Sequence, residues 1–310
     1  MNPPTPTAAM WRAVSGCTSR CGDLFGCPGI SNGGAITPAG VSAFSGNISS
    51  TGSITASQDG IRIENLSTFT GNISNGGTIA GSAGVAHFNG VTLSVSTFIG
   101  TLTNTGTISG FVGIRAATTP GLGIFDSGVV NGIGGTAIQF GGGVNTLTLG
   151  SGFAINGNVL GSGNDVFQLA GSGTEAFDLS TIGAANQYRG FTTFNVVSGT
   201  WVVSNTFGQT QSWNVNGGTL AGTGNLSSVN VNNGGTLAPG LPGTAGGTLT
   251  ITGNLVMTSA ATYMINFSPT AASKTNVTGT ANINGVLIAN GVPGNYVGGT
   301  KYTLLRRRVG

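Results

Sequence analysis

The chain of 310 residues has very few charged side chains, which make up 5% of it. Ordinary globular domains carry about 25%. Classical disordered segments combine low hydrophobicity with high net charge, so this composition argues against disorder. The net charge of +3 comes from scattered residues and from three consecutive arginines near the end. A nucleic-acid groove needs a basic stripe. We therefore expect no nucleic acid among the partners.

Long apolar runs and helix signals are also missing. No apolar run approaches the ~20 residues of a membrane-spanning helix. No window combines apolar residues at helical spacing with a capping residue. The first residues lack a basic segment, and Arg12 interrupts what would be the apolar part of a secretory signal. The sequence thus predicts neither a helical fold nor a recognisable signal peptide within this chain.

Cysteine is absent after residue 27. The three cysteines, Cys17, Cys21 and Cys27, have a spacing that differs from zinc sites, and no histidine lies near them. Three thiols also cannot pair off completely. We interpret residues 1–30 as an unstructured, cysteine-containing leader. Nothing after it depends on the redox compartment.

Catalytic motifs are not recognisable either, so the sequence predicts no enzyme and no cofactor. The single histidine, His87, aligns with Ile63 and Ala116 in the repeats described below, which predicts an inward or corner-facing ring. No serine or cysteine nucleophile with an orienting carboxylate is readable around it. A polysaccharide-processing β-helix remains an alternative, and it would need acids that converge on one lateral face. The acids are scattered: Asp23, Asp59, Glu64, Asp126, Asp165, Glu175 and Asp178.

The only metal candidates are Asp165 and Glu175, which hold equivalent places in a ten-residue step within residues 161–179. That phrase weakly resembles a calcium-binding nonapeptide repeat, which has a shorter step and needs several consecutive turns. The pattern therefore favours two ordinary coils with inward Phe167 and Phe177, and leaves calcium as the alternative.

Glycine is abundant, with 58 residues, and it belongs to a repeated phrase. The copies read FSGNISSTGSITASQDGI at 44–61, FTGNISNGGTIAGSAGV at 69–85 and FIGTLTNTGTISGFVGI at 98–114. A blurred fourth copy starts at Phe125. Ile61, Val85 and Ile114 close the three clear copies behind a glycine. Self-similarity at this spacing, about 25 to 29 residues, is typical of a solenoid, propeller or array.

Within each copy apolar and polar residues alternate with a period of two, which indicates half-buried strands. Asn, Gly and Ser between these strands suit tight corners. The sequence predicts an all-β fold, a parallel β-helix of roughly 10–13 coils that bury one another's inner faces. We assign residues 31–200 to coils of about 25–29 residues, residues 201–305 to a second set, and residues 306–310 to a basic tail.

The second set contains the phrase GGTL at residues 217–220, 234–237 and 246–249, which predicts two successive coils that are shorter than those before. Residues 214–255 resemble the passenger-associated repeat of bacterial autotransporters, with its G-G-T-L-x-P-G and G-T-L-T-I-x-G-N segments. The resemblance extends over residues 31–305, and residues 262–305 look like the end of such a passenger, which would cap the helix. The outer-membrane barrel that follows a passenger in this family has no counterpart in this chain.

The resemblance implies a right-handed β-helix that is exported by type V secretion and displayed on, or shed from, a Gram-negative cell. Passengers of this kind are mostly adhesins, aggregation factors or stalks. We therefore expect a non-catalytic rod whose partners are glycan or protein on a host or surface, or sister rods. An inert fragment of a decayed autotransporter gene and a polysaccharide-processing enzyme are the alternatives.

Overall fold

The structure is a computed structural model that describes residues 43–82, 87–119 and 121–307. Parallel strands account for 60% of it and stack into a β-solenoid of about 10 turns. The described residues contain one helical element, the short 3-10 helix η1 (Leu179–Thr181). The prediction of an all-β parallel solenoid is confirmed. The predicted leader, with its three cysteines, lies outside the described residues.

The chain divides into two compact units. The first comprises residues 1–148 and 152–165, and the second residues 149–151 and 166–310. Strands β12 (Thr146–Leu149) and β13 (Ala154–Leu169) contain the change from one unit to the other. The strands that lie wholly in the first unit are β1 (Ala43–Ser45), β2 (Ile48–Ser50), β3 (Ser53–Thr55), β4 (Ile61–Thr70), β5 (Ile73–Asn75), β6 (Thr78–Ala80), β7 (Val91–Ile99), β8 (Thr101–Asn104), β9 (Thr107–Thr119), β10 (Gly123–Asp126) and β11 (Val129–Phe140).

The second unit holds the remaining strands, of which the longest, β15, has nine residues. They are β14 (Thr174–Asp178), β15 (Tyr188–Val196), β16 (Thr200–Ser204), β17 (Ser212–Val215), β18 (Thr219–Gly222), β19 (Asn225–Leu226), β20 (Ser228–Val231), β21 (Thr236–Pro239), β22 (Thr248–Ile251), β23 (Leu255–Met257), β24 (Thr262–Phe267), β25 (Lys274–Val277), β26 (Ala281–Ile283), β27 (Val286–Gly291) and β28 (Leu305–Arg307).

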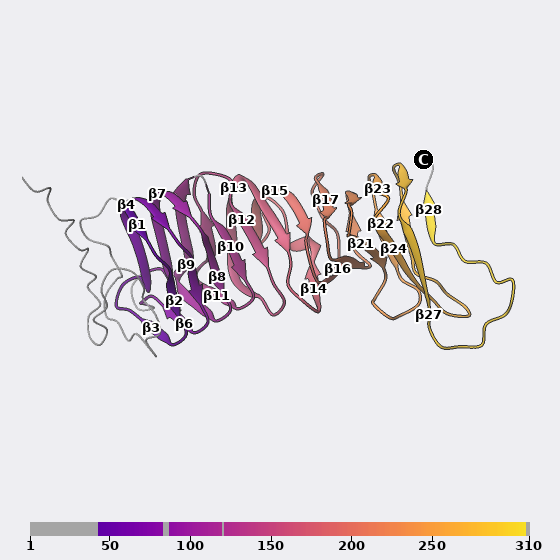
Figure 1. Cartoon of the computed structure of the whole chain (residues 1–310), viewed down its shortest axis with the longest axis horizontal. Coiled ribbons are helices and arrows are strands. Elements are labelled where there is room, and N and C mark those ends of the chain that lie inside the picture. Colours follow the sequence, from indigo (N-terminus) through magenta and orange to yellow (C-terminus); the bar gives the residue numbers. More distant parts are fainter. Residues whose placement is uncertain (1–42, 83–86, 120, 308–310) are drawn as a thin grey trace, which may run out of the picture. The chain divides into compact units, whose positions relative to one another are not determined.

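In the first unit each strand pairs in parallel with its counterpart one coil further on (Figure 1). Identical apolar positions therefore stack into buried columns, because side chains in register point to the same side of the sheet. Phe44, Phe69 and Phe98 form one column, with ring centroids 5.1 and 5.0 Å apart. Three further columns are Ile48–Ile73–Leu102–Ile124, Ile54–Ile79–Ile108–Val130 and Ile61–Val91–Ile114–Ile138.

Two registers differ from the repeat predicted from the sequence. Val91, and not Val85, lies between Ile61 and Ile114, so the second coil is longer before it returns to β7; Val85 itself lies outside the described residues. The fourth copy does not start at Phe125, because Ile124 pairs with Leu102 and Phe125 with Thr103. This shorter coil keeps an isoleucine in the buried column and turns Phe125 to the other side of the strand.

Close stacking of the coils requires glycine at Gly71. Its φ is +145°, and a Cβ there would lie 2.0 Å from the carbonyl oxygen of Gly46 in the preceding coil. Gly100 repeats the arrangement, 1.9 Å from the oxygen of Gly71. Any side chain at these positions would push the coils apart, which explains why glycine follows the opening phenylalanine of each repeat.

One buried column of the first unit is polar. Ser50, Asn75, Asn104 and Asp126 stack in register, and all four are buried. The Asn75 Nδ2 donates to Asn104 Oδ1 at 2.8 Å, and the Asn104 Nδ2 donates to Asp126 Oδ1 at 2.6 Å. Buried amides need such partners to avoid the cost of desolvation. The column therefore fixes the register of successive coils.

The core of the second unit contains larger side chains. Trp213 is fully buried, and its ring centroid lies 5.4 Å from Phe194 and 5.8 Å from Phe207. Phe167 and Phe177 are buried as predicted, with centroids 5.3 Å apart. Inward columns then continue with smaller residues: Trp201–Leu220–Leu237–Tyr263–Leu287 and Trp213–Val229–Leu255–Ala281.

The three GGTL phrases do not mark successive coils. Thr219 pairs with Thr236, which confirms the first of the two predicted short coils. Thr236 then pairs with Thr262, whereas Thr248 lies in a different sheet and pairs with Lys274. The second predicted short coil, between the second and third GGTL, is therefore wrong. The third GGTL lies in a strand on another side of the same turn. A phrase this short fits any strand with one inward leucine, so its recurrence does not mark a new coil.

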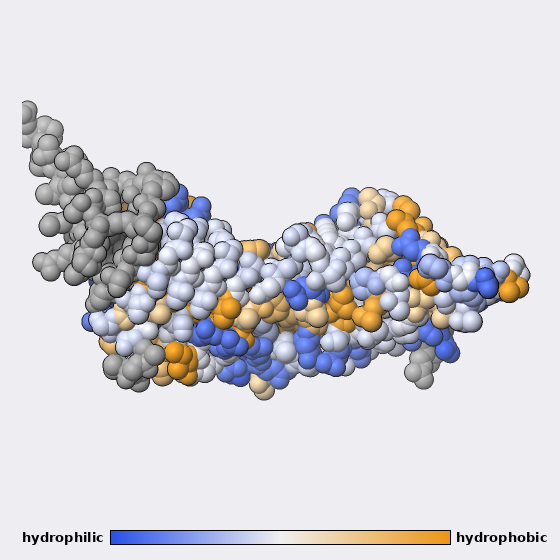
Figure 2. Space-filling model, turned by 90° about the horizontal axis from the view of Figure 1, so that it is seen from below, coloured by the Kyte–Doolittle hydropathy of each residue, from blue (hydrophilic) through white to orange (hydrophobic). Residues whose placement is uncertain are grey.

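The last strands of the second unit leave apolar residues exposed. Strand β27 lies at the edge of its sheet and all six of its residues are exposed, with Val286 at 56% and Leu287 at 53%. Figure 2 shows apolar residues at this end. The following segment is tied back by Tyr302, whose hydroxyl donates to the Ser268 carbonyl at 2.7 Å. Among the described residues, no helix has the length and hydropathy to cross a membrane.

Candidate functional site: a polar groove and a threonine column

A polar groove crosses strands β4, β7 and β9 of the first unit. One part of it has a volume of about 250 Å³ and the other about 450 Å³. Glu64, Ser94 and Ala117 line both parts, so the two are continuous. We call the whole the β4–β9 groove. Its lining is polar, and it contains both carboxylate and guanidinium groups.

Bulges in the strands shape this groove. Asn65 is an extra residue in β4, with φ of 60°, so that Glu64 pairs with Ser94 and Leu66 already with Val95. A second shift follows in the pairing of β7 with β9, between Val95 and Thr97. A bulge bends its strand and redirects side chains, and such irregularities are common beside functional sites. The bent strands thus provide a hollow on an otherwise regular face.

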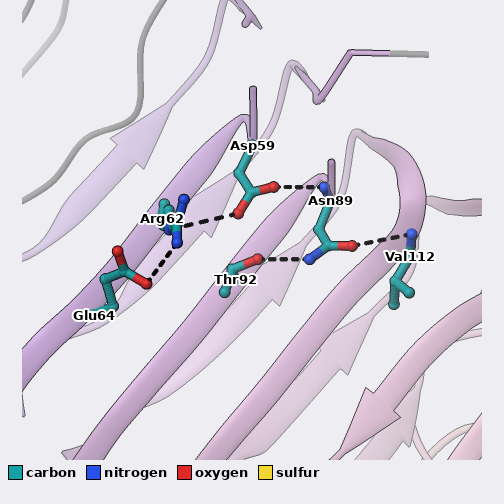
Figure 3. Close-up of polar contacts among 6 residues, drawn as sticks. All are labelled: Asp59, Arg62, Glu64, Asn89, Thr92 and Val112. Carbon is teal, nitrogen blue, oxygen red and sulfur yellow. Dashed lines mark hydrogen bonds and ion pairs between the residues drawn. The ribbon is translucent and has the colours of Figure 1, made fainter. Parts of the chain in front are cut away.

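A chain of side-chain to backbone hydrogen bonds closes the Asp59 end of the groove (Figure 3). The buried Asp59 Oδ1 accepts from the Asn89 backbone N–H at 2.7 Å. One coil further, the Asn89 Oδ1 accepts from the Val112 N–H at 3.2 Å, and its Nδ2 donates to Thr92 Oγ1 at 2.9 Å. Each corner residue therefore satisfies a backbone donor of the next coil. Asp59, which lines the groove, is positioned by this hydrogen bond.

Arg62 lies between two carboxylates in the same view. Its Nη2 is 2.9 Å from Glu64 Oε2, and its Nε is 4.0 Å from Asp59 Oδ2. The Arg62 side chain is 36% exposed and that of Glu64 27%, so solvent screens the pairs and their net contribution to stability is small. Because two carboxylates face one guanidinium, Arg62 has its charge compensated and the three residues together keep one negative charge in excess.

Arg115 has no such match. It follows Arg62 and Thr92 in the same column, one position per coil. Its side chain is exposed and lines the groove, and in the part of the chain that the structure describes it has no ion pair or hydrogen-bond partner. Beside it, the exposed His87 ring packs against Phe111, with ring centroids 5.6 Å apart. Among the described residues of the groove, Arg115 is therefore a guanidinium without an ion pair.

The structure corrects the placement of His87. Its φ of 106° and its turn place it at a corner, exposed, and not inward. Leu93 takes the position between Ile63 and Ala116 that the repeat alignment gave to His87. The longer second coil causes this shift. The corner-facing half of the prediction is confirmed.

The calcium candidates are in different units. Asp165 is fully buried in β13, where its Oδ1 accepts from Asn145 N at 2.8 Å and its Oδ2 from Ser162 N at 2.6 Å. Glu175 is half-buried in β14, in register with Trp201, and its Oε1 accepts from Ala176 N. The described residues contain no group of three or more His, Cys, Asp or Glu side chains that could hold a metal ion.

Sequence reasoning missed the groove because its residues come from separate coils. Asp59 and Glu64 are near each other in the sequence, but Arg115 belongs to a coil two steps further on. The phrases GIRIEN and GIRAAT, residues 60–65 and 113–118, were the available signal. They place an arginine at the same position of two coils that are otherwise almost free of charge.

A second candidate surface is a column of five threonines in the second unit. Thr174, Thr200, Thr219, Thr236 and Thr262 pair in register on β14, β16, β18, β21 and β24. Each is exposed or half-buried. Within the described residues none of the five hydroxyls has a hydrogen-bond partner in the chain. At about 4.8 Å per coil, the threonine column is roughly 19 Å long.

An outward asparagine column in the same unit behaves differently. Asn214 Nδ2 donates to Asn195 Oδ1 at 3.2 Å, and Asn230 Nδ2 donates to Asn214 Oδ1 at 3.0 Å. These amides use their hydrogen-bonding capacity on one another and support the stacking of coils. The threonine hydroxyls, in contrast, are available to a partner. Most of the surface visible in Figure 2 is pale, between the hydrophilic and hydrophobic extremes.

In the comparisons with known proteins, no protein-family model, no curated protein and no solved structure matches this chain.

Proposed function

We propose that the chain is a non-catalytic, passenger-type β-solenoid that acts in adhesion or aggregation at a cell surface. The observation that supports this most strongly is the threonine column, an array of five identical groups that the fold repeats and leaves unpaired. Such an array is suited to many weak contacts with one extended partner. Glycan, protein or a sister solenoid could supply the matching donors and acceptors.

The strength of such contacts favours display over binding as a single molecule. Each hydroxyl contact contributes about 0.5 to 1.5 kcal/mol net. One solenoid would hold a surface weakly, whereas many copies on one cell gain strength because each binding event raises the effective concentration for the next. This arithmetic supports a role as one of many displayed copies.

The resemblance of residues 214–255 to autotransporter passengers supports the same proposal. It includes the GGTL phrases whose leucines Leu220 and Leu237 stack in one buried column. On this basis we propose export by type V secretion and display at, or release from, the outer surface of a Gram-negative bacterium.

A polysaccharide-processing enzyme is the second candidate, because Asp59 and Glu64 line the same groove. Both carboxylates already have partners within the chain, however. Asp59 accepts from the Asn89 backbone, and Glu64 is paired with Arg62. A general acid or base must be free to exchange a proton with the substrate. These contacts favour binding in the groove over catalysis.

The test is to display residues 31–305 on a non-adherent bacterium through an autotransporter barrel. The displayed cells are expected to clump or to attach to glycan, matrix or plastic surfaces, while soluble protein competes poorly. Salt at about 0.5 M is expected to weaken attachment only slightly, because few charges are involved. Display without any clumping or attachment would contradict the proposal and favour an inert fragment of a decayed gene. Release of sugars from a polysaccharide would favour the enzyme.

A further inference from the structure

We infer that the β4–β9 groove binds an acidic polysaccharide, a polymer of sugars that carry carboxylate groups, with Arg115 as the carboxylate-binding residue. This names a partner class for the proposed adhesive function and rests on that function. It uses different residues from the threonine column, so the two can be tested separately.

The two arginines of the groove differ in their ionic partners. Arg62 is matched by Asp59 and Glu64, whereas Arg115, two coils away in the same column, meets no acid among the described residues. An anionic group of a ligand can therefore pair with Arg115, whereas the Asp59–Arg62–Glu64 cluster in the same part of the groove, with one negative charge in excess, favours uncharged hydroxyl groups. A guanidinium suits a carboxylate well, because its planar donors can form two parallel hydrogen bonds.

The remaining lining of the groove suits a sugar. The Thr92 hydroxyl accepts from Asn89, which leaves its own proton free to donate, and Ser94 is an exposed hydroxyl beside it. The His87 ring, packed against Phe111, offers both an aromatic face and a polar edge. Ligand sites commonly combine such flat apolar surfaces with a few placed polar groups.

The shape of the groove suits a polymer. The part beside Arg115 has about 250 Å³, slightly below the range of ~300–1,000 Å³ that encloses drug-sized ligands. It continues into the larger part beyond Glu64, Ser94 and Ala117. A groove with a small charged end and a continuation accommodates one charged sugar and its uncharged neighbours along a polymer.

Other anionic polymers fit less well. Nucleic acids are held by rows of cations that neutralise several phosphates, and this groove has one unmatched guanidinium. A neutral glycan would leave the exposed Arg115 guanidinium without an ionic partner. A divalent cation at the acidic end would have to displace Arg62 from between Asp59 and Glu64.

The experiment measures binding of the full chain to immobilised polygalacturonate, with neutral dextran and dextran sulfate as comparison polymers. Arg115→Gln is expected to weaken polygalacturonate binding roughly tenfold or more, because a charge-assisted pair is lost. The matched control, Lys301→Gln, removes the same charge from an exposed residue outside the groove and is expected to leave binding unchanged. Equal melting temperatures of the two variants establish that both are folded.

Three results would overturn the inference: no binding of polygalacturonate by the natural chain, equal binding of dextran, or equal losses in the two variants. Equal binding of dextran sulfate that Arg115→Gln also abolishes would show recognition of any polyanion and reject the carboxylate class. Displayed cells separate this inference from the proposed adhesion. If cells that display Arg115→Gln still attach to neutral surfaces, adhesion is supported independently of what the groove binds. If the chain binds polygalacturonate but displayed cells do not attach, the ligand of the groove is supported and the adhesive function is not.

Discussion

We expect Asp126, at the end of the buried polar column, to give the stability of the protein an unusual dependence on pH. Its side chain is fully buried. Desolvation raises the pKa of its carboxyl from 3.8 to about 6, although hydrogen bonds from the Asn104 side chain and the Gly128 backbone partly oppose that rise. Its Oδ2 has no hydrogen-bond partner in the part of the chain that the structure describes. The charged form of Asp126 is therefore poorly accommodated.

The sign of the effect follows from the two pKa values. The folded state, with a pKa of about 6, binds the proton more tightly than the unfolded state, with 3.8. Stability therefore increases as the pH falls from about 6 to 3.8, opposite to the usual behaviour of a salt-bridged carboxylate. At about 1.4 kcal/mol per pKa unit, ionised Asp126 costs roughly 3 kcal/mol at neutral pH.

Asp126→Asn removes this cost and keeps the shape and the acceptor that Asn104 needs. We expect the free energy of unfolding to rise by about 2 kcal/mol at neutral pH, since the new amide donor offsets roughly 1 kcal/mol of the gain. The gain is expected to shrink as the pH falls and to reverse to a loss of about 1 kcal/mol below pH 3.8, where the natural side chain is neutral and only the offset from the new amide donor remains. Thermal melts of both chains from about pH 4 to 8 measure it, at roughly 2–4 °C per kcal/mol. A difference that does not change with pH, or a lower melting temperature of the variant at neutral pH, would refute this reasoning.

Two further substitutions test the packing. Gly71→Ala is expected to destabilise the chain by about 2–4 kcal/mol, because the new Cβ would lie 2.0 Å from the Gly46 oxygen and φ is +145°. The control Gly76→Ala is expected to be neutral or slightly stabilising, because the nearest atom to its new Cβ is 3.7 Å away. Equal melting temperatures of the two variants would contradict the stacking of coils. Trp213→Ala is expected to cost about 3–5 kcal/mol in chemical denaturation, because it empties a buried aromatic cluster around Phe194; a loss below about 1 kcal/mol would show that this core is not packed as described.

Sequence patterns predicted the strands well because alternation has a direct physical meaning. Residues such as Ile54, Ile79 and Ile108 must share one buried column if every coil buries its neighbour's inner face. The phenylalanine column of the first unit follows from the same argument. Its three members occupy equivalent positions in three copies of similar length.

Coil length was harder to predict, because corners can absorb extra residues. Glycine followed by valine occurs at residues 84–85, which end the second copy, and again at residues 90–91, and either pair fits the motif. Pairing of Val91 with Ile61 and Ile114 decides between them. The groove depends on this register, because it brings Arg62, Thr92 and Arg115 into one column. Of the two candidate surfaces, only part of the threonine column could be predicted from the sequence. That part is Thr219 and Thr236, which belong to the GGTL phrases of two successive coils.

The adhesive role of the threonine column is tested most directly by changing its five residues, Thr174, Thr200, Thr219, Thr236 and Thr262, to valine in the displayed chain. Valine keeps the β-branched shape and the strand preference but removes every hydroxyl. Attachment of the displayed cells, counted after washing and compared at equal copy number, is predicted to fall to the level of cells that display the barrel alone. The melting temperature of the soluble variant should stay close to that of the natural chain. Attachment equal to that of the natural chain would contradict the proposal that this column binds the surface.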